Sequence, residues 1–268
     1  MVLEKEREIA VYAVRRAARI IAANSQSQER LKKDHTPQTL ADVKSKDCIR
    51  SILRENFPED LIITEEDEKE QLKERKARKK NCWIVDPLDG TSAFLRGSGD
   101  YGVIIGYVIG NEAMVGVTYN IPKRELVYAS KGEGAHLFRE RVTKRISVRF
   151  TEEFFLLRSN SRKSSELERM IEVLGISKKN QTRMSSALKL VEIAKGNGTL
   201  YLSPRDLRTN SWDLCGTGVI LEEAGGRMTD VYGSRHHFRG NTANYNGVVG
   251  SNGIIHPRVL EAIKEVVY

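Results

Sequence analysis

The stretch CWIVDPLDGTSAF, residues 82–94, joins a short apolar run to two aspartates that stand three positions apart. The apolar run is typical of a buried strand. Asp86 and Asp89 follow it, with Pro87 between them and Gly90 directly after. The proline removes a backbone donor and fixes a turn, and the glycine lets the backbone approach a ligand. The stretch therefore predicts two carboxylates at the end of a strand.

These carboxylates indicate a metal ion bound together with an anion. Thr91 begins a predicted short helix, whose free backbone N–H groups favour an anion. Two carboxylates beside that anion would repel it unless cations lie between them. Hard oxygen ligands suit Mg²⁺, which is typically shared with a substrate phosphate. Asp86 and Asp89 alone also fit a structural role, since an aspartate at the end of a strand often caps a turn.

Length and composition predict a globular protein. The chain has 268 residues, enough for one large or two small domains, and 40% of them are hydrophobic. The three cysteines, Cys48, Cys82 and Cys215, form no CxxC pair, so we expect reduced thiols. No apolar run approaches the roughly 20 residues that span a bilayer, and no apolar signal segment follows Met1. We therefore expect a cytoplasmic protein without a membrane partner.

The net charge of +8 leaves several interpretations open. Much of the excess lies in EKEQLKERKARKK, residues 68–80, with seven Lys or Arg and three Glu. This run fits a solvated helix or mobile flap, and it could also attract an anionic substrate or contact nucleic acid. No RNA-binding motif with interleaved aromatic residues accompanies it, so a nucleic-acid partner is not expected.

The rest of the chain alternates helices with short strands. Helical periodicity predicts helices at residues 3–24, 42–56, 164–175, 185–197, 212–226 and 256–268. Apolar runs predict strands at residues 61–64, 82–87 and 199–203, and an antiparallel meander over 101–138. This mixture predicts an α+β or layered α/β fold.

Two further acids follow predicted elements. Glu65 stands at the end of the LIIT strand, in ITEED, and Asp213 stands near the start of a helix, in NSWDLCGTG. Asp213 could equally be a favourable charge at a helix N-terminus.

Taken together with Asp86 and Asp89, these acids make the chain resemble the inositol monophosphatase and fructose-1,6-bisphosphatase superfamily of Mg²⁺-dependent phosphatases. The resemblance rests on three blocks in the same order: EED at 65–67, WIVDPLDGT at 83–91 and WDLCGTGVILEEAGG at 212–226. It runs from about residue 11 to the C-terminus. It implies a single phosphatase unit with a layered αβαβα fold, whose metal-site half covers about residues 1–150 and whose second half covers about 151–268.

The resemblance also implies roles for the acids. The implied ligands of two or three Mg²⁺ ions are Glu65, Asp86, Asp89, Asp213 and the carbonyl of Leu88. Gly90 and Thr91 would offer backbone N–H groups to the phosphate, which Asp89 and Asp213 would also contact. The Thr91 hydroxyl, with Glu65 and Asp42, would orient and deprotonate the attacking water. The metal ions would activate that water and stabilise the leaving oxygen.

Two segments are most similar to the 3'(2'),5'-bisphosphate nucleotidase branch, the CysQ-type enzymes. KKDHTPQTLAD, residues 32–42, places Asp42 where the branch assists the water, although a helix N-cap is an alternative role. PRDLRTNSWD, residues 204–213, places Arg205 where the branch binds a second phosphate. Inositol monophosphatases generally have a glutamate in this segment, whereas here Asp206 lies between arginines that prefer phosphate to a neutral polyol.

The SSALK segment adds two implied contacts to that phosphate, Ser186 and Lys189. Without the resemblance, Lys189 reads as a solvated helix residue. Three positions depart from the branch: Asn160 stands where histidine is usual, and Ser92 and Ala93 stand where many members have Lys-Glu. The departures leave the purine contacts open.

The sequence thus predicts a Mg²⁺-dependent phosphomonoesterase that removes the 3'-phosphate of adenosine 3',5'-bisphosphate to give AMP. Activity on inositol, sugar or histidinol phosphate is the alternative among enzymes. A catalytically inactive, nucleotide-sensing binding protein is an alternative of another class, and the intact acidic set argues against it. Dimers are common in the family, so a homodimer is expected.

Overall fold

The computed structural model of the protein describes residues 3–25, 29–31, 37–65, 67, 81–97, 99, 101–160, 163–207, 209–238, 243–244 and 246–268. The basic run at 68–80 lies outside these residues, so its role stays a prediction. The three cysteines are free thiols. None of the helices in the described ranges has the length and apolar character needed to cross a membrane.

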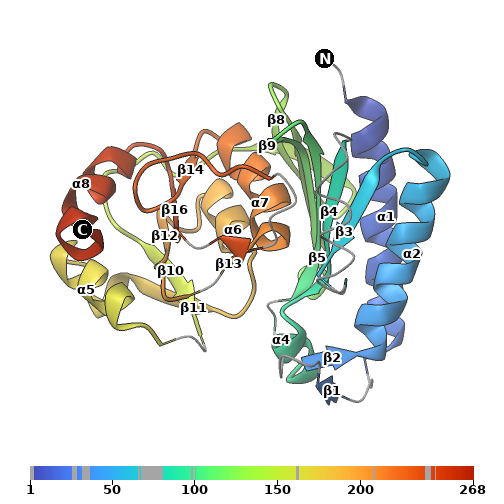
Figure 1. Ribbon diagram of the computed structural model, residues 1–268, viewed down its shortest axis with the longest axis horizontal. Coiled ribbons are helices and arrows are strands. Elements are labelled where there is room, and N and C mark those ends of the chain that lie inside the picture. Colours follow the sequence, from blue (N-terminus) through green and yellow to red (C-terminus); the bar gives the residue numbers. More distant parts are fainter. Residues whose placement is uncertain are drawn as a thin grey trace.

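The molecule has five layers, in the order helices, sheet, helices, sheet, helices (Figure 1). Helices α1 and α2 cover the outer face of a seven-stranded sheet, α6 and α7 form the central layer, and α5 and α8 cover a five-stranded sheet. The helices are α1 (Glu4–Ala23), α2 (Leu40–Asn56), α4 (Thr91–Leu95), α5 (Ser165–Val173), α6 (Lys189–Ala194), α7 (Ser211–Glu223) and α8 (His256–Val267), with a 3₁₀ turn at Lys178–Asn180. The predicted layered α/β fold is confirmed.

The large sheet has the strand order β3-β4-β5-β6-β7-β8-β9. Its first two strands are parallel and all other neighbours are antiparallel, as predicted for the meander. Its strands are β3 (Leu61–Thr64), β4 (Cys82–Asp89), β5 (Gly102–Ile109), β6 (Glu112–Asn120), β7 (Glu125–Ser130), β8 (Gly134–Arg139) and β9 (Val142–Ile146). Every residue of β4 is buried, because helices cover both faces of the sheet.

The smaller sheet has the order β11-β10-β12-β16-β14 and mixes parallel with antiparallel pairs. Its strands are β10 (Leu156–Ser159), β11 (Gln181–Met184), β12 (Leu200–Ser203), β14 (Arg227–Thr229) and β16 (Val248–Ser251). Two short pairs complete the described strands: β1 (Glu29–Leu31) with β2 (Pro37–Thr39), and β13 (Thr209–Asn210) with β15 (Ala243–Asn244).

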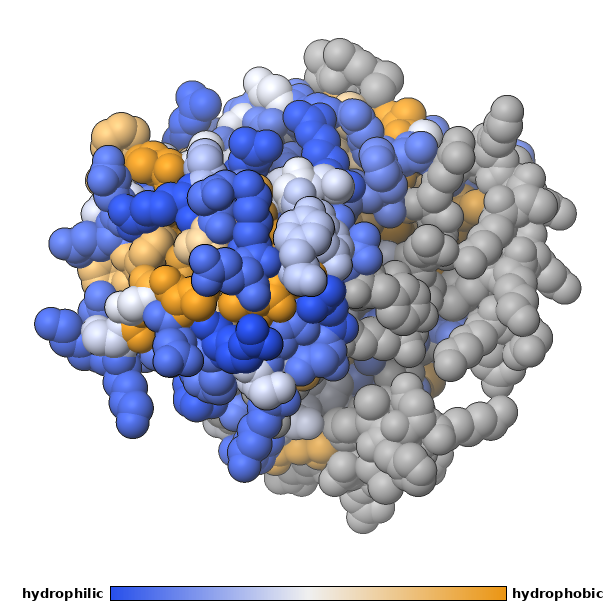
Figure 2. All heavy atoms as spheres, turned by 60° about the vertical axis from the view of Figure 1, so that its left-hand side comes forward, coloured by the Kyte–Doolittle hydropathy of each residue, from blue (hydrophilic) through white to orange (hydrophobic). Residues whose placement is uncertain are grey.

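The outer helices of the smaller sheet are amphipathic. Leu167 and Met170 of α5 are buried with Val259 and Ile263 of α8 in one apolar core. Figure 2 brings this side of the molecule forward and shows a mostly hydrophilic surface interrupted by a small apolar area.

Glycines let α7 lie unusually close to the large sheet. A Cβ atom added at Gly106 would overlap the Cys215 side chain, and one added at Gly116 would overlap the backbone of Gly216. This close approach carries the first turn of α7, and with it Asp213, toward the end of β4.

A buried ionic cluster joins α6 and the residue after it to the large sheet. Lys195 Nζ donates to Glu125 Oε2 at 2.6 Å and to Glu192 Oε1 at 2.8 Å. All three side chains are 10% exposed or less. Lys123 also pairs with Glu192, and Arg139 pairs with Glu125. Burying these charges costs desolvation free energy. Removing one partner therefore leaves the remaining buried charges less well compensated.

We expect Lys195→Met to lower the free energy of unfolding by about 3 kcal/mol, because it leaves two buried glutamates without their shared cation. Urea unfolding would measure it. Lys264→Met is the matched control, since Lys264 pairs with Glu261 at an exposed site, and it should cost less than about 1 kcal/mol. Equal effects of the two substitutions would contradict a structural role for the cluster.

Candidate active site

A cavity of about 310 Å³ lies where the end of β4 meets the central helices. Its walls come from the turn after β3, the end of β4, α4, the segment before α6 and the start of α7. Most of the predicted site residues line it: Glu65, Asp86, Leu88, Asp89, Gly90, Thr91, Ser186, Lys189 and Asp213.

A β-bulge lets both aspartates of β4 serve this cavity. Asp86 is paired with Ile104 of β5 and Asp89 with Gly102, so β4 contains one residue more than its partner. In a regular strand, residues three apart point to opposite faces. The extra residue, at the turn that contains Pro87, changes that alternation.

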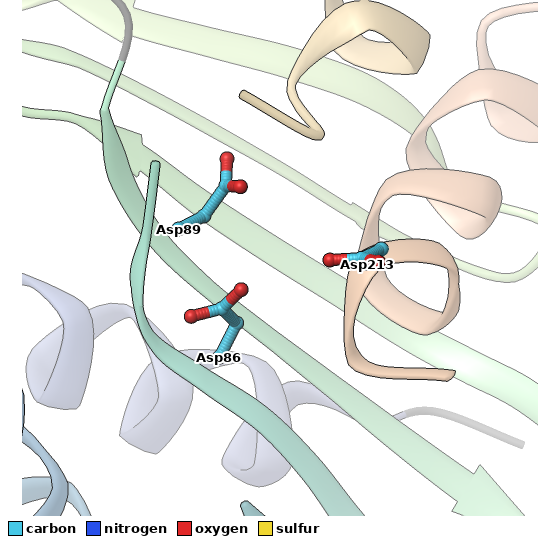
Figure 3. Close-up of side chains that lie close together, drawn as sticks. All are labelled: Asp86, Asp89 and Asp213. Carbon is cyan, nitrogen blue, oxygen red and sulfur yellow. The ribbon is translucent and has the colours of Figure 1, made fainter. Parts of the chain in front are cut away.

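Three carboxylates converge as a result (Figure 3). Oxygens of Asp86, Asp89 and Asp213 lie within 4.8 Å of one another. Asp86 and Asp89 are buried, and Asp213 is partly buried in the first turn of α7. The predicted acids from two distant parts of the sequence therefore meet at one site.

The crowding raises the affinity of these groups for protons. Burial raises the pKa of Asp86 well above its ordinary value, and the charges of Glu65, Asp89 and Asp213 raise it further. Burial and the charge of Asp213 raise the pKa of Asp89 to about 7, although the Ala187 amide, Lys189 and Ser186 oppose the shift. A cation held among these oxygens would relieve the repulsion.

Glu65 adds a fourth carboxylate beside the cluster. Its amide donates to the Val85 carbonyl at 3.1 Å, which fixes the turn after β3. Its side chain is hydrogen-bonded with that of Asp86. Leu88 lines the same cavity, and its carbonyl oxygen lies 3.2 Å from the Thr91 hydroxyl oxygen. Carboxylates and a carbonyl form the hard-oxygen donor set that divalent cations such as Mg²⁺ prefer, so the residues present fit a metal.

Asp42 is the third residue of α2 and Thr39 is the N-cap, so the alternative of Asp42 as the N-cap residue is wrong. Its Oδ2 accepts from the amide and hydroxyl of Thr39, at 2.7 and 2.6 Å, and so completes a capping box. Its Oδ1 accepts from the Thr91 hydroxyl at 3.1 Å. Ser45, one turn later, donates to the Pro87 carbonyl at 2.7 Å and holds α2 against the metal-site turn.

The segment before α6 departs from the predicted helix. The helix begins at Lys189, not at residue 185, because the Leu188 amide donates to Ser186 Oγ at 3.1 Å rather than to a backbone carbonyl one turn earlier. The Ala187 amide donates to both oxygens of Asp89 at 2.9 Å. These bonds attach the segment to the acidic site.

Lys189 is buried, so the alternative of a solvated helix residue is wrong. Its ammonium donates to the Ser186 carbonyl and lies 5.5 Å from the centre of the Tyr201 ring. Its charge also lowers the pKa of Asp89, against the larger effect of burial.

Arg205 does not line the cavity. Its guanidinium donates to Glu166 at 2.9 Å, to the Tyr232 hydroxyl at 3.0 Å and to the Val267 carbonyl at 2.9 Å. Arg96, for which the sequence analysis made no prediction, does line the cavity. It follows α4 and donates to Ser185 Oγ at 3.4 Å. Among the described residues, the cations that line this cavity are Arg96 and Lys189.

Apolar side chains also line the cavity, which the sequence did not reveal. Leu167, Tyr201, Leu207 and Trp212 line it. They come from four separate segments, so no local pattern marks them as a group.

Comparisons with known proteins bear on the family and the fold. The sequence model of the inositol monophosphatase family matches residues 2–268. Fructose-1,6-bisphosphatase/inositol-1-monophosphatase of Thermotoga maritima is 29% identical over 80% of this chain and 77% of its own. The 3'(2'),5'-bisphosphate nucleotidase CysQ of Escherichia coli K12 is 30% identical over 75% of this chain and 79% of its own length. The solved Thermotoga maritima IMPase superposes with a TM-score of 0.80, at 24% identity and 98% coverage of both chains.

We expect Mg²⁺ to raise the melting temperature more at about pH 8 than at about pH 5.5. The folded pKa of Asp89, about 7, exceeds the ordinary value of 3.8. The folded protein therefore binds the extra proton between these values, and the stability of the metal-free protein falls as pH rises through that window. A cation binds the ionised carboxylates, so protons compete with it at low pH.

Thermal unfolding in EDTA and in excess MgCl₂ at the two pH values would measure this effect. Asp89→Asn should reduce both the Mg²⁺ response and its pH dependence. Asp206→Asn, an exposed aspartate outside the cavity, should keep both. A Mg²⁺ response that is independent of pH, or that persists in Asp89→Asn, would argue against a metal at this cluster.

Proposed function

Because the chain belongs to the inositol monophosphatase family, a family of phosphatases, we propose that it is a Mg²⁺-dependent phosphomonoesterase whose preferred substrate is adenosine 3',5'-bisphosphate. It would release the 3'-phosphate and leave AMP. The observation that carries the proposal is the buried carboxylate cluster with the Lys189 ammonium beside it.

The metal site would be formed by the residues that crowd the end of β4. The carboxylates of Glu65, Asp86, Asp89 and Asp213, with the Leu88 carbonyl, would hold two or three Mg²⁺ ions. Bound there, Mg²⁺ would supply the positive charge that binds phosphate and the Lewis acidity that activates water.

Thr91 and Asp42 would orient the attacking water. Because the Thr91 hydroxyl donates to Asp42 Oδ1, a lone pair of Thr91 Oγ1 would accept a hydrogen bond from that water, and Asp42 would take the Thr91 proton as Oγ1 takes one from the water. Glu65, at the end of β3, would assist in deprotonating it. Gly90, whose φ of 81° lies in the left-handed region, shapes the turn whose amides would face the phosphate.

Lys189, Ser186 and Arg96 would bind the second phosphate of a bisphosphate. Lys189 and Arg96 line the same cavity as the acids, whereas Arg205 would first have to exchange its contact with Glu166. The apolar residues of the lining suit a purine base. The likeness to CysQ, which is named for activity on bisphosphate nucleotides, supports this substrate.

A second candidate is a phosphatase for inositol, sugar or histidinol phosphate. The contact of Arg205 with Glu166 favours it, because that contact removes from the cavity the arginine on which the nucleotidase resemblance depends. The likeness to the Thermotoga maritima phosphatase, named for both fructose-1,6-bisphosphatase and inositol-1-monophosphatase, also supports it.

The substrate proposal predicts the highest kcat/KM for adenosine 3',5'-bisphosphate among substrates that include inositol 1-phosphate and histidinol phosphate. Lys189→Met should lower the ratio of bisphosphate to inositol phosphate kcat/KM by about tenfold or more, since a charged contact is lost. Arg205→Ala should leave the ratio nearly unchanged. Phosphate release with Mg²⁺ would measure both.

The ratio cancels any general loss of activity in the variants. A preference for inositol or histidinol phosphate would overturn the substrate and leave the metal site standing. If Arg205→Ala loses the preference for the bisphosphate and Lys189→Met keeps it, Arg205 must turn into the cavity when substrate binds. Nucleotide binding without phosphate release from any substrate would indicate a binding protein.

The catalytic roles predict that Thr91→Ala and Asp42→Asn each lower kcat by about 100-fold or more, while Thr91→Ser keeps most of it. The Mg²⁺-induced rise in melting temperature should persist in all three, because neither residue is assigned to the metal. Thr39→Ala is the control for capping: it should cost about 1 kcal/mol of stability and little kcat. A large fall in kcat in Thr39→Ala would assign the effect of Asp42 to the helix.

A further inference from the structure

A second cavity, of about 330 Å³, lies among α1, the end of β6 and β8. It shares no lining residue with the active-site cavity. Its polar walls are three arginines, Arg15 and Arg19 of α1 and Arg124 of the turn between β6 and β7. Tyr119 and Phe138 supply aromatic surface.

The cavity is uniformly positive. No carboxylate is among its described lining residues. In the part of the chain that the structure describes, none of the three arginines pairs with an acid. Arg139, on the same strand as Phe138, contrasts with them, because it pairs with Glu125 and Glu140. The cavity therefore concentrates positive charge that the fold does not neutralise.

The fold brings the three arginines to one cavity. Arg15 and Arg19 are one helical turn apart and so lie on the same face of α1. The Arg15 guanidinium stacks over the Phe138 ring, 4.6 Å from its centre. Arg124 has a φ of 52°, a left-handed conformation that a non-glycine residue rarely adopts, in a turn closed by its amide to the Ile121 carbonyl at 3.2 Å. Small alanines of α1 line the space between them.

We propose that this cavity binds a small molecule that carries two or more adjacent phosphate charges. A guanidinium matches phosphate geometry with paired N–H donors, and three of them need a polyanion rather than a single charge. A second copy of this chain fits poorly, because a two-fold contact at this face would bring two like-charged arginine sets together. The volume suits a small ligand.

Isothermal titration of the full-length protein with inorganic pyrophosphate, in EDTA at about 150 mM salt, tests the site directly. Without metal, the carboxylates of the active site repel the probe, and the salt screens diffuse attraction. A second titration with adenosine 5'-diphosphate distinguishes phosphate recognition alone, which predicts equal affinity, from additional contact with the base, which predicts tighter binding. Both results support the site.

The Arg19→Gln/Arg124→Gln variant should bind pyrophosphate at least about tenfold more weakly than wild type, with unchanged phosphatase activity. Both side chains are exposed, so folding should be retained. The matched control is Arg16→Gln/Arg141→Gln, two exposed arginines outside the cavity. This variant removes the same net charge, and its affinity for pyrophosphate should lie within about twofold of the wild-type value.

Three results would overturn the proposal. The first is the absence of saturable pyrophosphate binding to the wild type. The second is an equal loss of pyrophosphate affinity in both double variants, which would indicate diffuse electrostatic attraction. The third is weakening in Lys189→Met but not in Arg19→Gln/Arg124→Gln, which would place the probe in the active site. Since the titration contains no metal and measures no turnover, it is independent of the proposed phosphatase activity.

Discussion

The repulsion among buried carboxylates at the end of β4 is the constraint on which the site depends. Asp86 and Asp89 reach the same cavity because a bulge adds a residue between them, and Asp213 reaches them because glycines let α7 lie close to the sheet. Burial and mutual charge raise the pKa of Asp86 and of Asp89, which is the electrostatic cost of this arrangement. The packing of the surrounding layers holds the groups together against that cost, and a cation among the oxygens would remove it.

Two helix N-termini give this site its precision. Asp42 and Asp213 each stand at the third position of a helix, where one carboxylate oxygen accepts from the backbone of the capping residue, Thr39 or Asn210. The capping bond fixes the rotamer, and Asp42 turns its other oxygen to the Thr91 hydroxyl. A bond at the helix terminus and a contact in the cavity are therefore compatible for Asp42, because the first orients the side chain for the second.

The sequence predicted what local patterns determine. The alternation of helices and strands was sufficient to predict an α+β or layered α/β fold, and the family resemblance carried by the ordered acidic blocks implied the five layers and the meeting of the acids. Contacts between distant segments could not be predicted. Arg205 stands in a segment typical of phosphate binding, but Glu166, about forty residues earlier, accepts its guanidinium. The start of α6 was placed too early because the Leu188 amide donates to Ser186 Oγ rather than to a helical carbonyl, and the Ala187 amide donates to Asp89.

That last contact shows how the layers share one site. Asp89 belongs to the large sheet, and the amide that it accepts belongs to the segment before α6. The far end of the same helix is held to the large sheet by Lys195, which lies between Glu125 and Glu192. Helix α6 is thus held at both ends, by an amide at the acidic site and by an ion cluster away from it. The position of Lys189 at the start of this helix therefore follows from contacts at both ends of a helix of six residues.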